Sequence, residues 1–438
     1  MAGPVLAESL LLYLTQMVDL ALVAPLGEVA LAAVGLAILP LYLFLGPVVG
    51  FSVGLASRIS RATGAGREDE VERLTRHGLL IGLPLALLVA GALGLGASAV
   101  VRLMGAEPAV QGPAAAYLRL SSPGLAALFL SIVLGTAITA AGLPRIPLLF
   151  RGGGNLLGIL LEWLLIYGHG GLPRLGLAGA ALAGSLARVI ACAGLLLWLL
   201  RRRRGSRIDP ARLPGVDRQT WKSITAVGLP AALDRVLDAL NYLLYTRWIA
   251  ALGTAAVAQH YVVYNLQELP FMVAMALATG VGVAAGQQLG GGSEQGAREA
   301  AYRGGALALG AAVLVVALTH FFPEACLHFF TPGARPEPAQ VAVLQVSGWV
   351  QLPMMVAVVF QGALGGVGDT RALVWISALG GWLVRLGLVW LLAFAAGWGL
   401  AGAWVAAGLD WALRLVLLGQ RVRRRRWLGA SEEPAFAR

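Results

Sequence analysis

Four acidic residues stand inside apolar segments, where a charged side chain is energetically costly. Asp19 lies in YLTQMVDLALVAPLG and Glu162 in LLGILLEWLLIYG, while Asp238 and Glu268 lie in the second half of the chain. An ionisable residue in a membrane-spanning segment usually faces a cavity or a charged partner. The four acids therefore predict a site that couples transport to an ion or binds a cation, with a purely structural role as the alternative for each.

Two of these acids belong to the first half of the chain. Asp19 stands fifteen residues after Pro4, about four turns into a helix, and we expect it in a transport cavity. The alternative is a packing role in which Gln16 or Arg188 holds it. Glu162 has apolar neighbours on both sides, and because removal from water disfavours a charged carboxyl, it suits proton exchange. Pairing with Arg188 or Arg385 is an equally good interpretation of Glu162.

The segment around residue 238 has a second group of polar side chains. Asp234 and Asp238 are one helical turn apart on one face, and Asn241 follows after Asp238. Asp238 is the deeper of the two acids and is predicted to take part in ion coupling. Asp234 and Glu8 each follow a helix-starting proline by one turn and are predicted gate residues, with a solvated helix start as the alternative. Asp410 and Arg414 have i,i+4 spacing, which favours a structural pair.

Aromatic and methionine side chains gather near the acids of the second half. Acids beside aromatic faces attract organic cations by charge and by cation–π contacts, and methionines adapt to ligands of varied shape. Most aromatic residues of membrane helices nevertheless face lipid or protein core. The predicted substrate-binding residues are Asp19, Gln16, Asn155, Asn241, Tyr245, Glu268, Met272 and Met354.

The composition places these residues in a membrane. Of 438 residues, 58% are hydrophobic and 13% are charged, and the mean hydropathy is +0.78, whereas a soluble domain is about one quarter charged. A spanning helix needs about 20 apolar residues, so the sequence predicts an all-α integral membrane protein. Its twelve predicted spans are 4–26, 32–58, 76–103, 110–141, 146–168, 175–200, 222–251, 254–286, 299–322, 338–366, 372–396 and 399–420.

The two halves of the chain repeat one another. Gly27 and Gly142 recur at one constant spacing as Gly253 and Gly368, and the segment GLAGA at 176–180 recurs at 399–403. Repeats in an apolar chain are typical of secondary transporters. We therefore expect two six-helix bundles related by pseudo-two-fold symmetry. The predicted divisions are a first bundle at 1–200, a basic cytoplasmic linker at 201–221, a second bundle at 222–422 and a cytoplasmic tail at 423–438.

The basic residues predict the orientation. The net charge is +11, and with a cytoplasmic N-terminus nearly all arginines outside the spans fall in cytoplasmic loops. This pattern indicates a multi-pass membrane protein with both termini in the cytoplasm, and we expect it in the bacterial inner membrane. The arginines flank spans, so they favour contact with anionic lipid and not with nucleic acid. We expect no cleavable signal peptide. The first helix begins almost at Met1, which is compatible with a start codon further upstream.

Motifs for catalysis are missing from the sequence. Five histidines are scattered, and no HExxH, paired CxxC, Walker loop or GxSxG motif occurs. We therefore expect no enzymatic activity, no cofactor and no resident metal. The two cysteines form no disulfide framework. Because no nucleotide site is recognised, uphill transport would have to use an ion gradient.

The order and spacing of several segments resemble the multidrug and toxic compound extrusion (MATE) family over nearly the whole chain. Within that family, the chain looks closest to the branch named for the DNA-damage-inducible protein. The resemblance implies twelve helices in two bundles, cytoplasmic termini, and export of cationic drugs in exchange for sodium ions or protons. The segments that carry it are 18–37, 64–69, 155–183, 228–258, 286–292 and 365–371.

The resemblance also implies roles for single residues. Asp19 matches the family's helix 1 acid, Asp238 the helix 7 acid of the sodium-linked branch, and Glu162 the helix 5 acid of the DNA-damage-inducible branch. Gly158 stands where the latter branch has Asn, and Met354 stands where the sodium-linked branch has a helix 10 acid. Because sodium prefers several oxygen ligands in one site, the loss of these two side chains favours protons over sodium as the coupling ion.

The sequence therefore predicts an ion-coupled, proton-linked antiporter that exports amphipathic, mostly cationic organic compounds by alternating access. Its expected partners are small organic cations and membrane lipids, and it is expected to work as a monomer. The alternative is a flippase for lipids or lipid-linked precursors, which would need a basic cleft built from Arg188, Arg235, Arg247 and Arg385. A scaffold or receptor that transports nothing would give the intramembrane acids no role.

Overall fold

The computed structural model describes residues 2–201, 217–328, 337–424 and 427. Within these ranges the chain forms helices joined by short turns, and no strand occurs, so the all-α prediction is confirmed. The chain divides into two compact units, one made essentially of Gly3–Ala232 and the other of Leu233–Arg438. Most of the predicted linker and of the predicted C-terminal tail lies outside the described residues.

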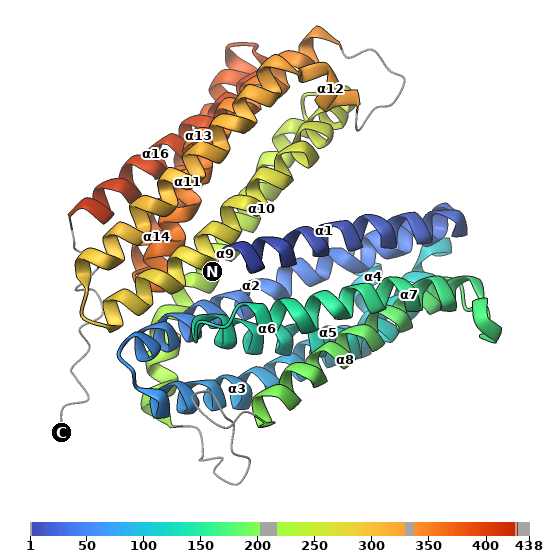
Figure 1. Cartoon of the computed structure of the whole chain (residues 1–438). Coiled ribbons are helices and arrows are strands. Elements are labelled where there is room, and N and C mark those ends of the chain that lie inside the picture. The colour runs from blue at the N-terminus through green and yellow to red at the C-terminus, as the bar shows by residue number, and fades with distance from the viewer. Residues whose placement is uncertain (1, 202–216, 329–336, 425–426, 428–438) are drawn as a thin grey trace. The chain divides into compact units, whose positions relative to one another are not determined.

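The first unit contains six long helical segments, coloured from blue to green in Figure 1. The first four segments are single helices, and the last two follow a turn at Gly142. A short helix, α4 (Ala97–Leu103), connects the third segment to the fourth. The six segments are α1 (Ala2–Val23), α2 (Glu28–Gly64), α3 (Glu68–Leu95), α5 (Pro108–Ala140), the run of α6 (Arg145–Pro147), η2 (Leu148–Gly152) and α7 (Gly153–Tyr167), and α8 (Leu177–Arg201).

The second unit repeats this order. It begins within α9 (Arg218–Ala250), and a short helix, α12 (Pro323–His328), takes the place of α4. The other five long segments are α10 (Thr254–Gly290), α11 (Glu294–Phe321), α13 (Pro338–Gly366), the run of α14 (Thr370–Ser377), η5 (Ala378–Arg385), α15 (Leu386–Val389) and η6 (Trp390–Ala395), and α16 (Gly399–Arg423). The twelve long segments agree with the twelve predicted spans.

Among the described residues, ten helical segments are long and apolar enough to cross a membrane by length and composition. α9 is long enough, but Asp234, Arg235 and Asp238 lie within it. The third predicted span, 76–103, is too long: α3 ends at Leu95 and α4 begins at Ala97, with Gly96 between them. Glycine is a poor helix former, and the apolar run on both sides concealed this break.

The repeat is also present in the backbone conformation. Gly27 has φ 100° and ψ 174°, and its counterpart in the second copy, Gly253, has φ 107° and ψ 166°. Residues with a side chain rarely adopt such a φ, whereas glycine does so at little cost. α2 and α10 then both run for 37 residues, and α3 and α11 both run for 28 residues. The sequence repeat therefore encodes the same turn and the same helix lengths twice.

One helix forms the centre of each unit. In the most apolar stretch of α5, 67% of residues are buried, and in that of α13, 72% are buried, more than in any other candidate span. α5 packs against α2, α3 and α8, and α13 packs against the equivalent α10, α11 and α16. Small residues permit these contacts: a Cβ on Gly282, Gly362 or Gly366 would collide with backbone atoms across the α10–α13 contact.

The division between the units differs from the predicted one. It lies between Ala232 and Leu233, inside α9, and not at the expected 201–221 linker. The reason is packing: a Cβ on Gly54 of α2 would meet backbone atoms of Ile224 and Gly228. The first turns of α9 thus pack closely on α2 and belong to the first unit.

Candidate functional site

The first unit brings two predicted acids together. Asp19 on α1 and Glu162 on α7 face one another, with Arg188 of α8 near both. A Cβ on Gly184 would lie 3.7 Å from Glu162 Oε1 and 3.8 Å from Arg188 Nη1, which places both groups beside the same turn of α8. Tyr117 of α5 lies near all three charged groups.

Glu162 is buried and Asp19 is half-buried, and neither acid has its full set of hydrogen bonds. Only 7% of the Glu162 surface is exposed. Among the described residues, Asp19 Oδ1 and Glu162 Oε2 have no hydrogen-bond partner. Two charged carboxylates that face one another repel, whereas the positive charge of Arg188 attracts both of them.

The other predicted residues of the first unit differ from this acid pair in their exposure or in their partners. Gln16 is exposed, and Asn155 is half-buried in the first turn of α7. The predicted gate residue Glu8 pairs with Arg151 of η2, with 2.7 Å between Oε1 and Nη1. Glu8 thus ties α1 to a π-helical turn, a form that often occurs at functional sites.

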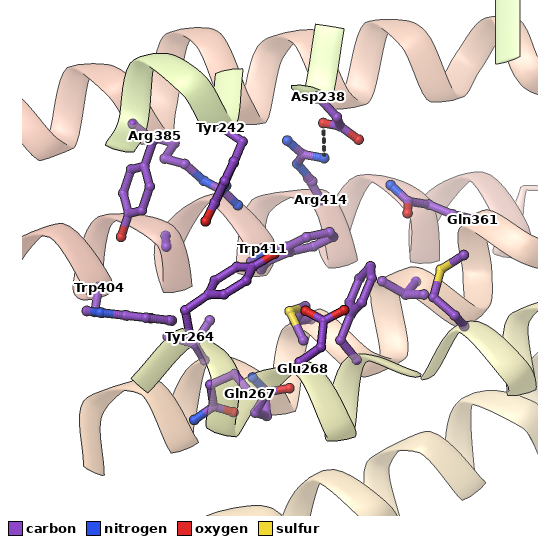
Figure 2. A pocket seen from close by; sticks show the side chains of 18 of the residues that line it. Asp238, Tyr242, Tyr264, Gln267, Glu268, Gln361, Arg385, Trp404, Trp411 and Arg414 are labelled. Carbon is purple, nitrogen blue, oxygen red and sulfur yellow. Dashed lines mark hydrogen bonds and ion pairs between the residues drawn. The ribbon is translucent and has the colours of Figure 1, made fainter. Parts of the chain in front are cut away.

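The second unit has a buried network of ion pairs. The Arg414 side chain is 1% exposed, and its Nε donates to Asp410 Oδ1 at 2.7 Å while its Nη1 donates to Asp238 Oδ1 at 3.2 Å. Arg385 Nη2 lies 2.7 Å from Asp410 Oδ2. The predicted pairing of Asp410 with Arg414 is confirmed, and Arg414 additionally joins α16 to α9 through Asp238 (Figure 2).

These charges border a cavity of about 250 Å³ inside the second unit. Its walls come from α9, α10, α13, η5 and α16 (Figure 2). Of the predicted site residues, four line it: Asp238, Tyr245, Glu268 and Met354. Arg235 and Arg385 of the predicted basic cleft also line it, and so does Arg414, which was predicted only as the partner of Asp410. Sequence reasoning missed four further lining residues: His260, Gln351, Trp404 and Trp411.

Three further predicted residues lie near the cavity without lining it. The side-chain amide of Asn241 donates to the carbonyl oxygen of Gly381 at 2.6 Å, which ties α9 to η5. Met272 is half-buried, whereas Met275 on the next turn of α10 lines the cavity. Asp234 is buried and faces both Asp238 and Ser377.

Charge is distributed unequally over the cavity wall. Arg385 and Arg414 are neutralised by Asp410 and Asp238. Glu268 faces the hydroxyl of Tyr264, and among the described residues no arginine pairs with it. Glu268 therefore offers its negative charge to the cavity interior, beside the aromatic wall formed by Tyr264.

The described residues include no group of three or more His, Cys, Asp or Glu side chains arranged to hold a metal ion. Each unit offers a candidate site of its own: an acid pair in the first unit and an aromatic, ion-paired cavity in the second. Two repeated six-helix units with buried intramembrane charges define a multi-pass membrane transporter.

Comparison with known proteins identifies the kind of transporter. A family model described as MatE matches residues 4–164 and 230–391, the same stretch of each repeat. The probable multidrug resistance protein NorM of Deinococcus radiodurans is 30% identical over 433 residues, which cover 97% of this chain and 94% of that protein. The protein of the same name from Pseudomonas aeruginosa is 31% identical over 429 residues, covering 93% and 85%.

Solved structures share the fold. A crystal structure of a MATE protein in a bent conformation has a TM-score of 0.90 at 20% identity and covers 98% of this chain and 94% of its own. A MOP superfamily transporter from Pyrococcus furiosus has a TM-score of 0.85 at 21% identity, with coverages of 99% and 96%. The chain belongs to the MATE family of multidrug and toxic compound extrusion transporters.

Proposed function

We propose that this protein is a proton-coupled antiporter that exports amphipathic, mostly cationic organic compounds by alternating access. The observation that supports the proposal best is the Asp19–Glu162 pair, in which two carboxyls face one another beside a single arginine. Such a pair of carboxyls can bind and release one proton as a unit, and no other ligand is needed.

Proton exchange at this pair would alter the contact between α1 and α7. With one proton the carboxyls attract one another through a hydrogen bond, and without it they repel. If protonation is more favourable in one of two conformations of the protein, proton binding shifts the equilibrium toward that conformation. The size of the shift equals the difference between the protonation free energies of the two conformations. A sodium ion would need more oxygen ligands than two carboxyls supply, and Gly158, one turn before Glu162, contributes no side-chain oxygen. Protons are therefore the better candidate.

The cavity of the second unit supplies the features that an organic cation needs. Glu268 provides a carboxyl that no described arginine pairs with, and the rings of Tyr242 and Tyr264, 5.4 Å apart, provide aromatic surface. Met275 and Met354 line the same cavity and can adapt to ligands of different shape. We assign substrate contact to this wall.

The remaining features are proposed from charge and composition. The protein lies in a bacterial inner membrane with both termini in the cytoplasm, a proposal that the arginine-rich loops support through the positive-inside rule. The protein acts on small organic cations, contacts membrane lipids, uses no cofactor and works as a monomer. No enzymatic step is part of this mechanism.

The test is resistance and transport in an efflux-deficient bacterial host. Expression of the wild-type protein should raise resistance to ethidium, and a protonophore should stop ethidium export in medium without sodium. Export that continues with the protonophore and increases with external sodium would overturn proton coupling. Loss of export in Asp19→Asn, with unchanged amounts of protein in the membrane, would support the role of the acid pair.

The alternative function, a lipid flippase, would need the arginines of the cavity to bind a lipid phosphate. Arg235, Arg385 and Arg414 all line it and could attract a lipid phosphate. Two of them already form ion pairs with acids, which lowers their attraction for an added anion. If reconstituted protein moves labelled anionic lipid between leaflets and does not move ethidium, the flippase function replaces the antiporter.

A further inference from the structure

A buried histidine lines the cavity, and neither the acid pair nor the ion-pair network uses it. His260 of α10 is 1% exposed. Three cavity-lining rings surround it: Trp404 at 5.5 Å between centroids, Tyr245 at 5.7 Å and Tyr264 at 6.0 Å. In Figure 2, Trp404 and Glu268 lie well apart along the cavity, with Tyr264 between them. The histidine therefore belongs to one end of the cavity.

Polar atoms at this end lack partners. Within the part of the chain that the structure describes, both ring nitrogens of His260, the Tyr245 hydroxyl and Trp404 Nε1 have no hydrogen-bond partner. Burying a polar group without a hydrogen bond destabilises a protein, and such groups are rare in folded chains. Four unpartnered atoms on three neighbouring rings indicate a site that a ligand completes.

We propose that His260, Tyr245 and Trp404 form an uncharged subsite for a planar aromatic group that carries both hydrogen-bond donors and acceptors. A neutral imidazole offers one donor and one acceptor, a phenol offers both, and an indole offers a donor. The surrounding ring faces and edges suit a flat aromatic partner. This inference rests on the proposed export of organic cations and defines the uncharged part of the substrate.

The charges of the cavity orient such a substrate. The guanidinium of Arg385 lies 5.7 Å from the centroid of Tyr245, so a second positive charge is disfavoured at the histidine end. Glu268 is eight residues after His260 on the same helix, about 12 Å along the axis. The ligand therefore binds with its neutral ring at His260 and its amine toward Glu268.

Two matched probes test this subsite with the purified full-length protein in lipid nanodiscs. One is dibucaine, in which an uncharged quinoline carboxamide is joined to a tertiary amine. The other is a naphthalene analogue with the same amine but without the ring nitrogen or the amide. Calorimetry gives the Kd of each. In His260→Phe, the ratio of the dibucaine Kd to the analogue Kd should rise about tenfold, as expected for loss of one or two buried hydrogen bonds.

A second variant and a control separate this effect from misfolding. Tyr245→Phe removes only the hydroxyl and should raise the same ratio by about threefold. Tyr261→Phe changes the neighbouring residue, which is 48% exposed, and should leave the ratio as in the wild type. If His260→Phe and Tyr245→Phe change both Kd values equally, or neither, the subsite is overturned while cation binding stands. If the wild type binds neither probe, the proposed cation export fails and this inference fails with it.

Discussion

The acid pair of the first unit and the cavity of the second unit arise from equivalent helices with different chemistry. Tyr245 occupies the position in the second copy of the repeat that Asp19 occupies in the first. Asp19 faces another acid, Glu162, whereas Tyr245 is a buried phenol beneath the guanidinium of Arg385. One copy of the repeat thus keeps an acid that can bind a proton, and the other has an aromatic ring at the same place. We interpret this as a division between ion coupling and substrate binding.

The two predicted gate residues show the same divergence. Glu8 and Asp234 hold equivalent positions in the two copies of the repeat, and so do their neighbours Arg151 and Ser377. Glu8 and Arg151 form a direct ion pair. Asp234 faces a serine and shares its surroundings with Asp238 and two arginines. The first unit therefore has a single ion pair at this position. The second unit has a larger group of charged residues there.

The largest effect should come from the acid pair. In proteoliposomes, Asp19→Asn should reduce ethidium uptake driven by a pH gradient by about 100-fold, because coupling free energies of roughly 1–3 kcal/mol correspond to factors of about 5–150. Glu28→Gln, an exposed acid at the start of α2, is the matched control and should transport normally. Normal coupling in Asp19→Asn would end the assignment of the proton site to the first unit.

The next effect concerns the stability of the ion pairs. Arg414→Met leaves Asp410, which is 0% exposed, as a buried charge with less compensation and should lower the free energy of unfolding by about 3–5 kcal/mol. Arg151→Met breaks a pair that is 26% and 16% exposed and should cost no more than about 1 kcal/mol. Thermal unfolding in detergent measures both. If both variants lower the free energy of unfolding equally, the ion pairs of the two units contribute equally to stability.

Substrate affinity should depend on the unpaired acid of the cavity. Glu268→Gln should weaken binding of tetraphenylphosphonium about tenfold, because it removes a charge that no described arginine balances. Asp238→Asn should have a smaller effect on binding, since Arg414 already neutralises Asp238. Calorimetry on both variants gives the comparison. A larger effect at Asp238 than at Glu268 would reverse the assignment of the cation-binding acid.

The smallest effect should occur at the start of α9. The Thr220 hydroxyl donates to Asp217 at 2.6 Å, and with the N–H groups of Gln219 and Thr220 it holds the pKa of the Asp217 carboxyl below its usual value. A depressed pKa means that the stabilisation is fully present above the unfolded-state pKa of about 3.9. It is lost as the pH falls through the lower folded-state pKa.

Hydrogen exchange measures this effect. The first turn of α9 should exchange faster in the wild type as the pH is lowered from about 5 to about 3, after correction for the intrinsic exchange rate. Asp217→Asn keeps a capping side chain that does not titrate in this range, so its protection should be independent of pH. A pH dependence that persists in Asp217→Asn would assign the effect to another group.

The sequence alone determined the features that depend on local order. Hydrophobic length predicted the twelve helical segments, since a membrane helix satisfies its own backbone hydrogen bonds and needs only enough apolar residues. The constant spacing of the repeat predicted two similar halves, and the positive φ angles at Gly27 and Gly253 show why glycines recur there. The i,i+4 spacing of Asp410 and Arg414 was sufficient to predict their pairing.

Only the tertiary structure decided which side chains meet across helices. Asp19 of α1 meets Glu162 of α7, and Asp238 of α9 pairs with Arg414 of α16. Such contacts depend on how each helix is rotated and which helix packs beside it, and small residues such as Gly184 and Gly381 permit the close approach. Neither property is encoded in the apolar pattern of a single segment. For the same reason, the unpartnered nitrogens of His260 could not be found without the folded chain, because two of the three cavity-lining rings that surround it, Tyr245 and Trp404, come from other helices.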